Sequence, residues 1–180
     1  ELRVCPACYK IFTPSLGIHS FSNNHDYAEY CAELPLGTRF KHNNVVYAVT
    51  GKVVKYEEND QQAIWCEYML TNAENENLYL SCWNGHWSLI EFLPDFDAET
   101  RPSRYMEDVS YEGINYTYFH KYKARFAYLE GEFNFNVFED DKKGCFEYIN
   151  PPYTLIFENE KGVKKFNAYR STYLYKSEVK

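Results

Sequence analysis

Two short apolar runs of the sequence each hold a carboxylate that is followed directly by a tyrosine. Glu67 lies in the run Trp65–Leu70 and Glu147 lies in the run Cys145–Ile149. Burial among apolar neighbours raises the pKa of a carboxyl group toward the range in which it serves as a general acid or base. If the two strands approach each other across a twofold axis, both carboxylates would share one site. The commoner alternative is that each glutamate accepts hydrogen bonds from amides or a tyrosine hydroxyl, or pairs with Lys or Arg.

Three further side chains are candidates for a site. Glu132 lies at a predicted turn, where functional side chains are often presented, although such a glutamate is more often only solvated. Trp83 and His86 flank the turn Asn84-Gly85 and would form an exposed recognition patch, unless residues 1–36 cover them. The weak catalytic candidates are therefore Glu67, Glu132 and Glu147. The predicted ligand-binding residues are Trp65, Glu67, Tyr68, Trp83 and His86.

A C-x-x-C motif opens the chain at Cys5-Pro6-Ala7-Cys8. Tetrahedral zinc requires four thiolate or imidazole donors, and such a turn supplies two of them at one corner. A second corner is missing, because the later donors occur singly, at His19, His25 and Cys31. Free thiols or a local disulfide are the alternatives to zinc. The predicted metal ligands are Cys5, Cys8, Cys31 and His25, and the possible cofactor is zinc.

The composition is that of a folded, acidic protein rich in rings. Of its 180 residues 45% are hydrophobic and 19% aromatic, with 18 Tyr and 13 Phe, which favour strands because flat rings pack well on a pleated surface. The formal net charge of −7 argues against general nucleic-acid binding, which depends on neutralising phosphates.

The cellular compartment is inferred from the cysteines and from the hydropathy of the chain. No apolar run approaches the ~20 residues that a membrane-spanning helix needs. Six cysteines are too few for a disulfide framework in a chain of this length. We expect a cytoplasmic protein, or an exported one if a leader preceded Glu1.

From Leu36 onward the apolar residues recur with a period of two, which indicates strands. Asn84-Gly85 predicts a type I′ hairpin turn, which places Cys82 opposite Trp87. At Gly51 the parity of the apolar positions flips, which predicts a β-bulge that bends its strand. Amphipathic helices of ordinary length are not predicted anywhere in the sequence.

The second half of the sequence repeats the order of the first. Glu67-Tyr68 corresponds to Glu147-Tyr148, which suggests an internal duplication. The predicted class is all-β: two related antiparallel halves that form a β-sandwich or a flattened barrel, preceded by a short irregular zinc-ribbon-like segment. We expect one compact domain overall, with the parts 1–33 (ribbon-like segment), 34–94 (first β half), 95–108 (linker) and 109–180 (second β half).

Several short motifs, taken in order, resemble a bacterial family known as domain of unknown function 4178. They are Leu36-Gly37 with Tyr47 and Gly51, then Trp65-x-Glu67-Tyr68-x-Leu70, then Gly131-Glu132-Phe133 with Pro151-Pro152 and Glu158. The resemblance covers about residues 34–175. It implies an N-terminal zinc-ribbon-like segment around Cys5 and Cys8, from which this chain departs by lacking a second C-x-x-C. It implies no established activity.

The expected function is a non-catalytic β module that binds a small-molecule ligand or a protein partner. One alternative is a hydrolase-like enzyme that uses paired glutamates, and another is a zinc-ribbon adaptor that acts through residues 1–31. Carboxyl groups within ~5–9 Å of each other across an open cleft would favour hydrolysis. Carboxylates that are separated or internally hydrogen-bonded favour binding.

Overall fold

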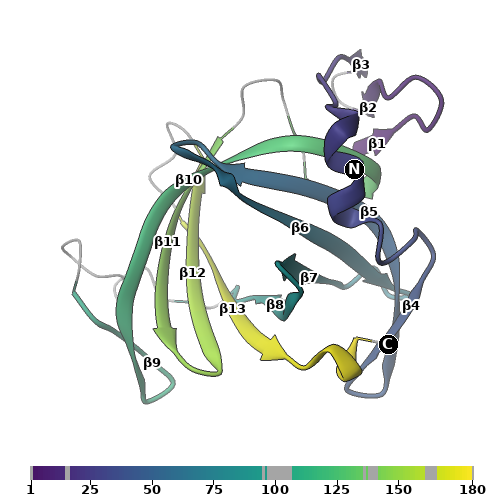
Figure 1. Cartoon of the computed structure of the whole chain (residues 1–180). Coiled ribbons are helices and arrows are strands. Elements are labelled where there is room, and N and C mark those ends of the chain that lie inside the picture. Colours follow the sequence, from purple (N-terminus) through teal and green to yellow (C-terminus); the bar gives the residue numbers. More distant parts are fainter. Residues whose placement is uncertain are drawn as a thin grey trace.

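Long antiparallel strands close into a barrel in the computed structural model, which describes residues 2–14, 17–94, 96, 107–135, 137, 142–160 and 166–179 (Figure 1). Within this described part, eight strands follow one another around the barrel in the order β5-β6-β7-β8-β13-β12-β11-β10, and β10 pairs back onto β5. The strands are β5 (Val45–Glu57), β6 (Asp60–Asn72), β7 (Asn77–Trp83), β8 (His86–Phe92), β10 (Ile114–Phe133), β11 (Lys142–Asn150), β12 (Tyr153–Glu160) and β13 (Asn167–Leu174).

The barrel consists of two four-stranded meanders, β5–β8 and β10–β13, joined at the seams β5–β10 and β8–β13. A short strand precedes each meander: β4 (Arg39–His42) pairs with β5, and β9 (Val109–Tyr111) pairs with β10. The predicted all-β class is confirmed, in its barrel form. Each meander has four strands and follows one short strand, and this shared order is compatible with an internal duplication, which stays a prediction. Most of the expected linker 95–108 lies outside the described residues.

Local sequence signals fix the hairpins and the bend of β5. The predicted turn at Asn84-Gly85 is confirmed, with Trp83 paired to His86 and Cys82 paired to Trp87. Asn84 and Gly85 both have positive φ, as a type I′ turn requires. The predicted bulge is also confirmed, because the register of β5 against β6 shifts between Val49 and Gly51.

Two glycines meet where β5 and β10 form their seam. Gly131 is the pairing partner of Gly51, and its φ is +96°. A Cβ atom at Gly131 would lie 2.3 Å from the carbonyl oxygen of Thr50, and one at Gly51 would lie 2.6 Å from that of Glu132. Real Cβ atoms do not approach a carbonyl oxygen so closely. The seam therefore requires glycine at both positions.

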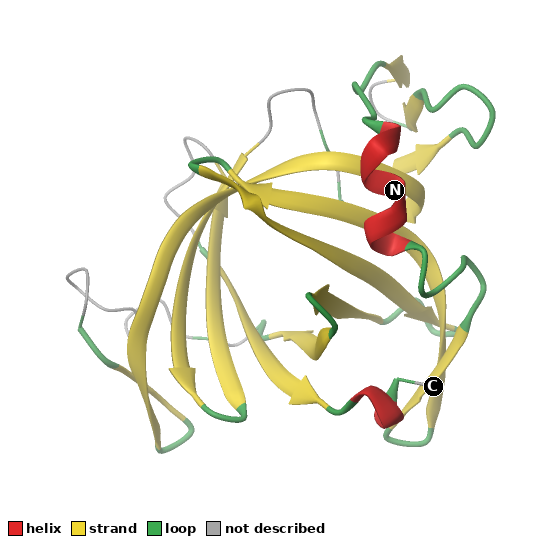
Figure 2. Ribbon diagram, viewed as in Figure 1, coloured by secondary structure: helices red, strands yellow, loops and turns green. Residues whose placement is uncertain are grey.

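The N-terminal segment is a small sheet that extends the edge of β10. It comprises β1 (Leu2–Val4), β2 (Ile11–Thr13) and β3 (Gly17–His19), followed by the 3₁₀ helix η1 (His25–Cys31). β1 pairs with the end of β10 through Leu2 and Phe133, and η1 contacts β5, β6 and β10 (Figure 2). The segment is thus more regular than the sequence predicted. In the described chain no helix is long and apolar enough to cross a membrane.

Two of the three apolar clusters in the described residues lie on the outer faces of the barrel strands. Lys55 on β5 reaches Glu158 on β12, although β10 and β11 separate these strands around the wall. Only side chains that face the lumen can meet in this way. Alternation along β6 and β11 therefore turns Tyr68 and Tyr148 outward. Tyr68 is buried in a cluster that includes Cys31 of η1 and Val179, whereas Tyr148 is buried in a cluster with Val109 of β9.

Replacing Gly131 with alanine should destabilise the fold far more than replacing Gly113. Both glycines have positive φ, but nothing lies within 4 Å of a Cβ at Gly113. We expect Gly113→Ala to cost about 1 kcal/mol through backbone strain alone and Gly131→Ala about 3 kcal/mol or more, because the seam must open. Urea unfolding of both variants measures the difference. Equal losses would show that the close approach at the seam is unimportant.

Candidate functional site

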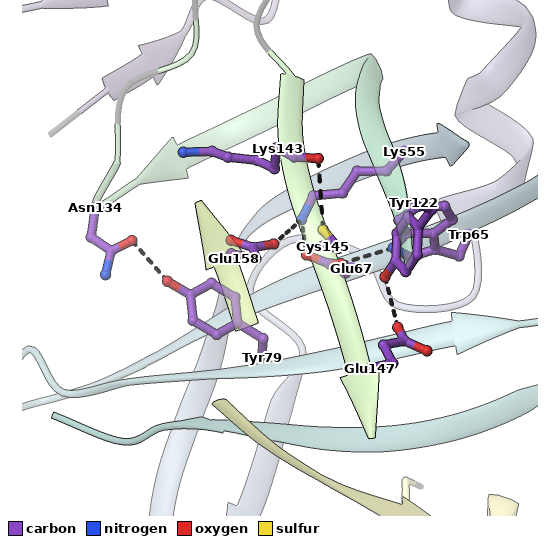
Figure 3. A network of polar contacts seen from close by, with 10 residues as sticks. All are labelled: Lys55, Trp65, Glu67, Tyr79, Tyr122, Asn134, Lys143, Cys145, Glu147 and Glu158. Carbon is purple, nitrogen blue, oxygen red and sulfur yellow. Dashed lines mark hydrogen bonds and ion pairs between the residues drawn. The ribbon is translucent and has the colours of Figure 1, made fainter. Parts of the chain in front are cut away.

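A cavity of about 380 Å³ lies in the barrel lumen. Each of the eight barrel strands contributes side chains to its wall, which identifies it with the lumen rather than with a surface groove. One lining residue from each strand, in chain order, is Lys55, Glu67, Tyr79, Ile90, Tyr122, Cys145, Glu158 and Tyr169. Figure 3 shows how six members of this set lie relative to one another: Lys55, Glu67, Tyr79, Tyr122, Cys145 and Glu158. The lumen is therefore the place where residues far apart in the sequence gather.

A buried lysine is the centre of the lumen network. The side chain of Lys55 is 8% exposed, and its Nζ lies 2.7 Å from Oε2 of Glu67 and 3.7 Å from Oε1 of Glu158. Burial by itself lowers the pKa of the Lys55 ammonium, but the two carboxylates outweigh it and the pKa lies above the ordinary lysine value. Lys55 is therefore a permanent cation that links β5, β6 and β12.

Glu67 is fully engaged by its neighbours. Lys55 donates to one of its carboxylate oxygens at 2.7 Å, and the indole Nε1 of Trp65 donates to the other at 2.8 Å. Alternation places Trp65 and Glu67 on the same face of β6, and Lys55 is the cross-strand partner of Trp65. Such a carboxylate holds two side chains in position, as in the commoner interpretation of its sequence context.

Glu147 faces the same lumen but has a partner of its own. The hydroxyl of Tyr122 donates to its Oε1 at 2.7 Å (Figure 3). Burial raises the pKa of the Glu147 carboxyl above its ordinary value, and it also raises the pKa of the Tyr122 hydroxyl. The ring of Tyr122 packs edge-on against Trp65 at 5.7 Å, so it lies between the Glu67 cluster and Glu147. The rings of Trp65 and Tyr122 therefore stand between the carboxylates of Glu67 and Glu147.

Aromatic rings form much of the remaining wall, with polar groups between them. Tyr79 on β7 donates from its hydroxyl to Oδ1 of Asn134, just beyond β10, at 2.9 Å. Tyr169 and Phe92 pack with ring centroids 5.5 Å apart. Burial raises the pKa of the Cys145 thiol well above its ordinary value, so the group is a weak nucleophile. This wall suits a bound molecule that has an apolar body and a few polar atoms.

The structure separates the residues that the sequence predicted to bind a ligand. Trp65 and Glu67 line the lumen, whereas Tyr68 is buried outside it and stacks on Trp87 at 5.7 Å. Trp83 and His86 lie at the exposed tip of the β7–β8 hairpin, where His86 Nδ1 is 3.4 Å from the hydroxyl of Tyr173. Of the predicted ligand-binding set, only Trp65 and Glu67 line the cavity.

The third catalytic candidate lies apart from the other two. The Glu132 carboxylate is 58% exposed and lies 3.4 Å from the guanidinium of Arg3 on β1. It belongs to the outer junction between the N-terminal sheet and β10. Glu132 therefore does not meet Glu67 or Glu147 in one site.

Sequence reasoning missed the residues that complete the lumen, chiefly Lys55, Tyr79 and Tyr169. One signal was present at Lys55, since a lysine inside the apolar run Val53–Tyr56 needs a counter-charge once its strand is covered. No local pattern connects it to Glu158. That pairing depends on how the barrel closes.

The N-terminal thiols form a tight turn that holds two potential metal donors. The amide of Tyr9 donates to the carbonyl of Cys5 at 2.8 Å, and the amide of Cys5 donates to the carbonyl of Lys10 at 3.0 Å. Hydrogen bonds from the amides of Ala7 and Cys8 lower the pKa of the Cys5 thiol. Of the other predicted ligands, Cys31 is buried in the cluster around Cys66, and the ring of His25 packs on Tyr9.

The donors present do not fit a closed tetrahedral zinc site. Across the described ranges, no group of three or more His, Cys, Asp or Glu side chains could hold a metal ion. Two thiols alone leave half of the coordination shell unfilled. The zinc site of Cys5, Cys8, Cys31 and His25 therefore stays a prediction from the sequence, and the contacts of the described residues do not support it.

Replacing Glu67 with glutamine should destabilise the barrel. The change leaves Glu158, at 3.7 Å, as the carboxylate that balances the buried Lys55 ammonium, and breaking a buried ion pair costs about 3 kcal/mol. Urea unfolding measures the loss. Glu132→Gln is the matched control, because its exposed pair with Arg3 is worth less than about 1 kcal/mol. Similar losses in the two variants would contradict the structural role of Glu67.

The reactivity of the cysteines toward an alkylating reagent should follow the exposure of their thiols. Cys8 is exposed and Cys5 half-buried, whereas Cys31, Cys66 and Cys145 are buried. We expect iodoacetamide to modify Cys5 and Cys8 in the native protein, and the three buried cysteines, Cys31, Cys66 and Cys145, only after unfolding, as mass spectrometry would show. We also expect no zinc to remain after dialysis against a chelator. Retention of one zinc per chain, with Cys5 and Cys8 protected, would show that other donors complete the site.

Comparison with known proteins gives a family and no closer relative. No curated protein matches the chain, and no solved structure matches it either. One family model matches residues 35–176, which span the barrel from before β4 to η3 (Lys176–Glu178). The chain therefore belongs to the family described as domain of unknown function (DUF4178).

Proposed function

We propose that this protein is a non-catalytic binding module that holds one small organic molecule in the lumen of its barrel. The observation that carries the proposal is the cavity of about 380 Å³ with a wall drawn from all eight strands. Ligand pockets commonly measure about 300–1,000 Å³. Barrels of about eight strands have an interior wide enough for one small ligand.

The wall of the cavity is organised before any ligand binds. Lys55, Glu67 and Trp65 hold one another through charge-assisted and neutral hydrogen bonds. Tyr122 is fixed by Glu147, and Tyr79 by Asn134. A preformed wall reduces the entropy that binding must overcome, and aromatic rings offer large contact areas. These features favour a compact ligand that contains a ring.

The chemistry of the wall favours binding over hydrolysis. A hydrolase with paired glutamates needs one carboxylate free to attack or to activate water, and a second one free to donate a proton. Both oxygens of Glu67 are engaged, and Glu147 accepts a hydrogen bond from Tyr122. The enzyme alternative therefore lacks support from the contacts of these residues.

The contacts of the N-terminal segment argue against a separate adaptor. Asn23 donates to the carbonyl of Leu129 on β10 at 2.9 Å and accepts from its amide at 2.8 Å. Leu2 and Ile11 are buried in one cluster with Val53 and Leu129 of the barrel. We therefore propose that residues 1–31 close one side of the binding module.

A bulky residue in the cavity wall should weaken the binding of a small apolar probe. We expect the uncharged dye N-phenyl-1-naphthylamine to gain fluorescence with the native protein. Asn167→Trp should reduce its affinity at least about tenfold, because Asn167 is an exposed residue that lines the cavity. Thr117→Trp is the control, since Thr117 is exposed on β10 and does not line the cavity. Equal binding to both variants would place the dye outside the lumen.

A further inference from the structure

Among the described residues, the cluster around Lys55 holds one more carboxylate than it holds ammonium groups. One ammonium, that of Lys55, faces two carboxylates, Glu67 and Glu158. Glu67 takes the close contact at 2.7 Å, and Glu158 keeps only the contact at 3.7 Å. This inference rests on the proposed function of the lumen as a ligand site. We propose that the ligand is a protonated amine attached to a ring, with the ammonium group bound at Glu158.

Glu158 has the capacity to accept such a group. Its distance of 3.7 Å from Lys55 is longer than a hydrogen bond, and none of the described residues donates a hydrogen bond to its carboxylate. The side chain is 20% exposed, and it lines the cavity. A partly buried carboxylate without a hydrogen bond gains more from a cationic donor than from water.

The lumen already binds an ammonium group of its own, and that site shows the chemistry. The Nζ atom of Lys55 lies between two carboxylates and 5.6 Å from the centre of the Phe126 ring. Carboxylate oxygens with an aromatic face are the surroundings that ammonium groups prefer. A ligand amine that approaches Glu158 from the side opposite Lys55 would likewise meet a carboxylate together with aromatic faces.

The rings for the second ammonium group are those of Tyr79 and Tyr169. Both line the cavity with Glu158. Tyr169 lies on β13 two residues from Asn167, the pairing partner of Glu158, so alternation places its ring on the same face as the Glu158 carboxylate. Burial raises the pKa of both tyrosine hydroxyls. Figure 3 shows the Glu158 carboxylate on the same side of the network as Tyr79. A cation beside an aromatic face is stabilised more strongly when water is excluded.

An anionic ligand does not suit this arrangement. The one cation in the cluster is held by Glu67, and an added carboxylate would face the charges of Glu67 and Glu158. Lys143 also lines the cavity, but its side chain extends away from Glu158 in Figure 3. The network therefore discriminates between ligands of equal size and opposite charge.

Displacement of the dye by three compounds of matched shape tests the proposal. They are 2-phenylethylamine, 3-phenylpropanoate and the uncharged 2-phenylethanol, each added at pH 7 to the native protein with bound N-phenyl-1-naphthylamine. We expect the amine to bind at least about tenfold more tightly than the carboxylate, with the alcohol between them. Isothermal titration calorimetry with the amine gives its affinity without the dye.

Two substitutions at one position locate the selectivity. Glu158→Gln should remove the preference for the amine while leaving the affinity for the uncharged dye unchanged. Glu158→Asp keeps the charge and should keep the preference. Glu112→Gln is the control, because that carboxylate lies outside the lumen beside Arg170. Circular dichroism confirms that each variant is folded.

The outcomes separate this inference from the function on which it rests. If the dye does not bind to the native protein, the lumen is not a ligand site and both proposals fail. If the dye binds but the amine and the carboxylate displace it equally, only the assignment of a cationic ligand fails. A preference that persists in Glu158→Gln would likewise overturn the role of Glu158.

Discussion

The buried ammonium of Lys55 is the constraint on which the lumen depends. An unpaired charge in that position would cost several kcal/mol, so the barrel must bring carboxylates to it. Glu67 comes from the neighbouring strand β6, and Glu158 comes from β12, which lies on the other side of β5 beyond β10 and β11. Only the closed form of the sheet places both beside Lys55. Barrel closure therefore supplies the carboxylates that the buried ammonium of Lys55 needs. The resulting ion pairs in turn favour the closed barrel over an open sheet.

A polar lumen shifts much of the apolar packing to the outer wall of the barrel. Tyr68, Trp87 and Leu80 turn outward on the first meander, and η1 with the C-terminal residues covers them. On the second meander Tyr148 and Phe157 turn outward, and β9 covers part of their cluster. These additions to the eight strands supply the hydrophobic burial that the lumen forgoes. The lumen keeps a cavity of about 380 Å³, while two of the three apolar clusters of the described residues pack outside it.

Parts of the fold were readable from short stretches of sequence. Asn84-Gly85 determines its hairpin because few other residue pairs tolerate the positive φ angles of a type I′ turn. The change of parity at Gly51 determines a bulge because a strand has a strict period of two. Alternation also placed Trp65 with Glu67 on one face and Tyr68 on the other. It could not say which face was the lumen, since both faces of β6 are largely covered.

The sequence by itself determined the all-β class, the hairpin and the bulge, because each depends on the conformational preferences of residues that are neighbours in the chain. The candidate site was only half predictable: Glu67 and Trp65 stood out, but their partners did not. Lys55 and Glu158 are 103 positions apart in the sequence. Tyr79 lies on β7 of the first meander, whereas its partner Asn134 follows β10 of the second. Only the tertiary structure decided these contacts, because they arise from closure of the barrel, a constraint that no local pattern contains.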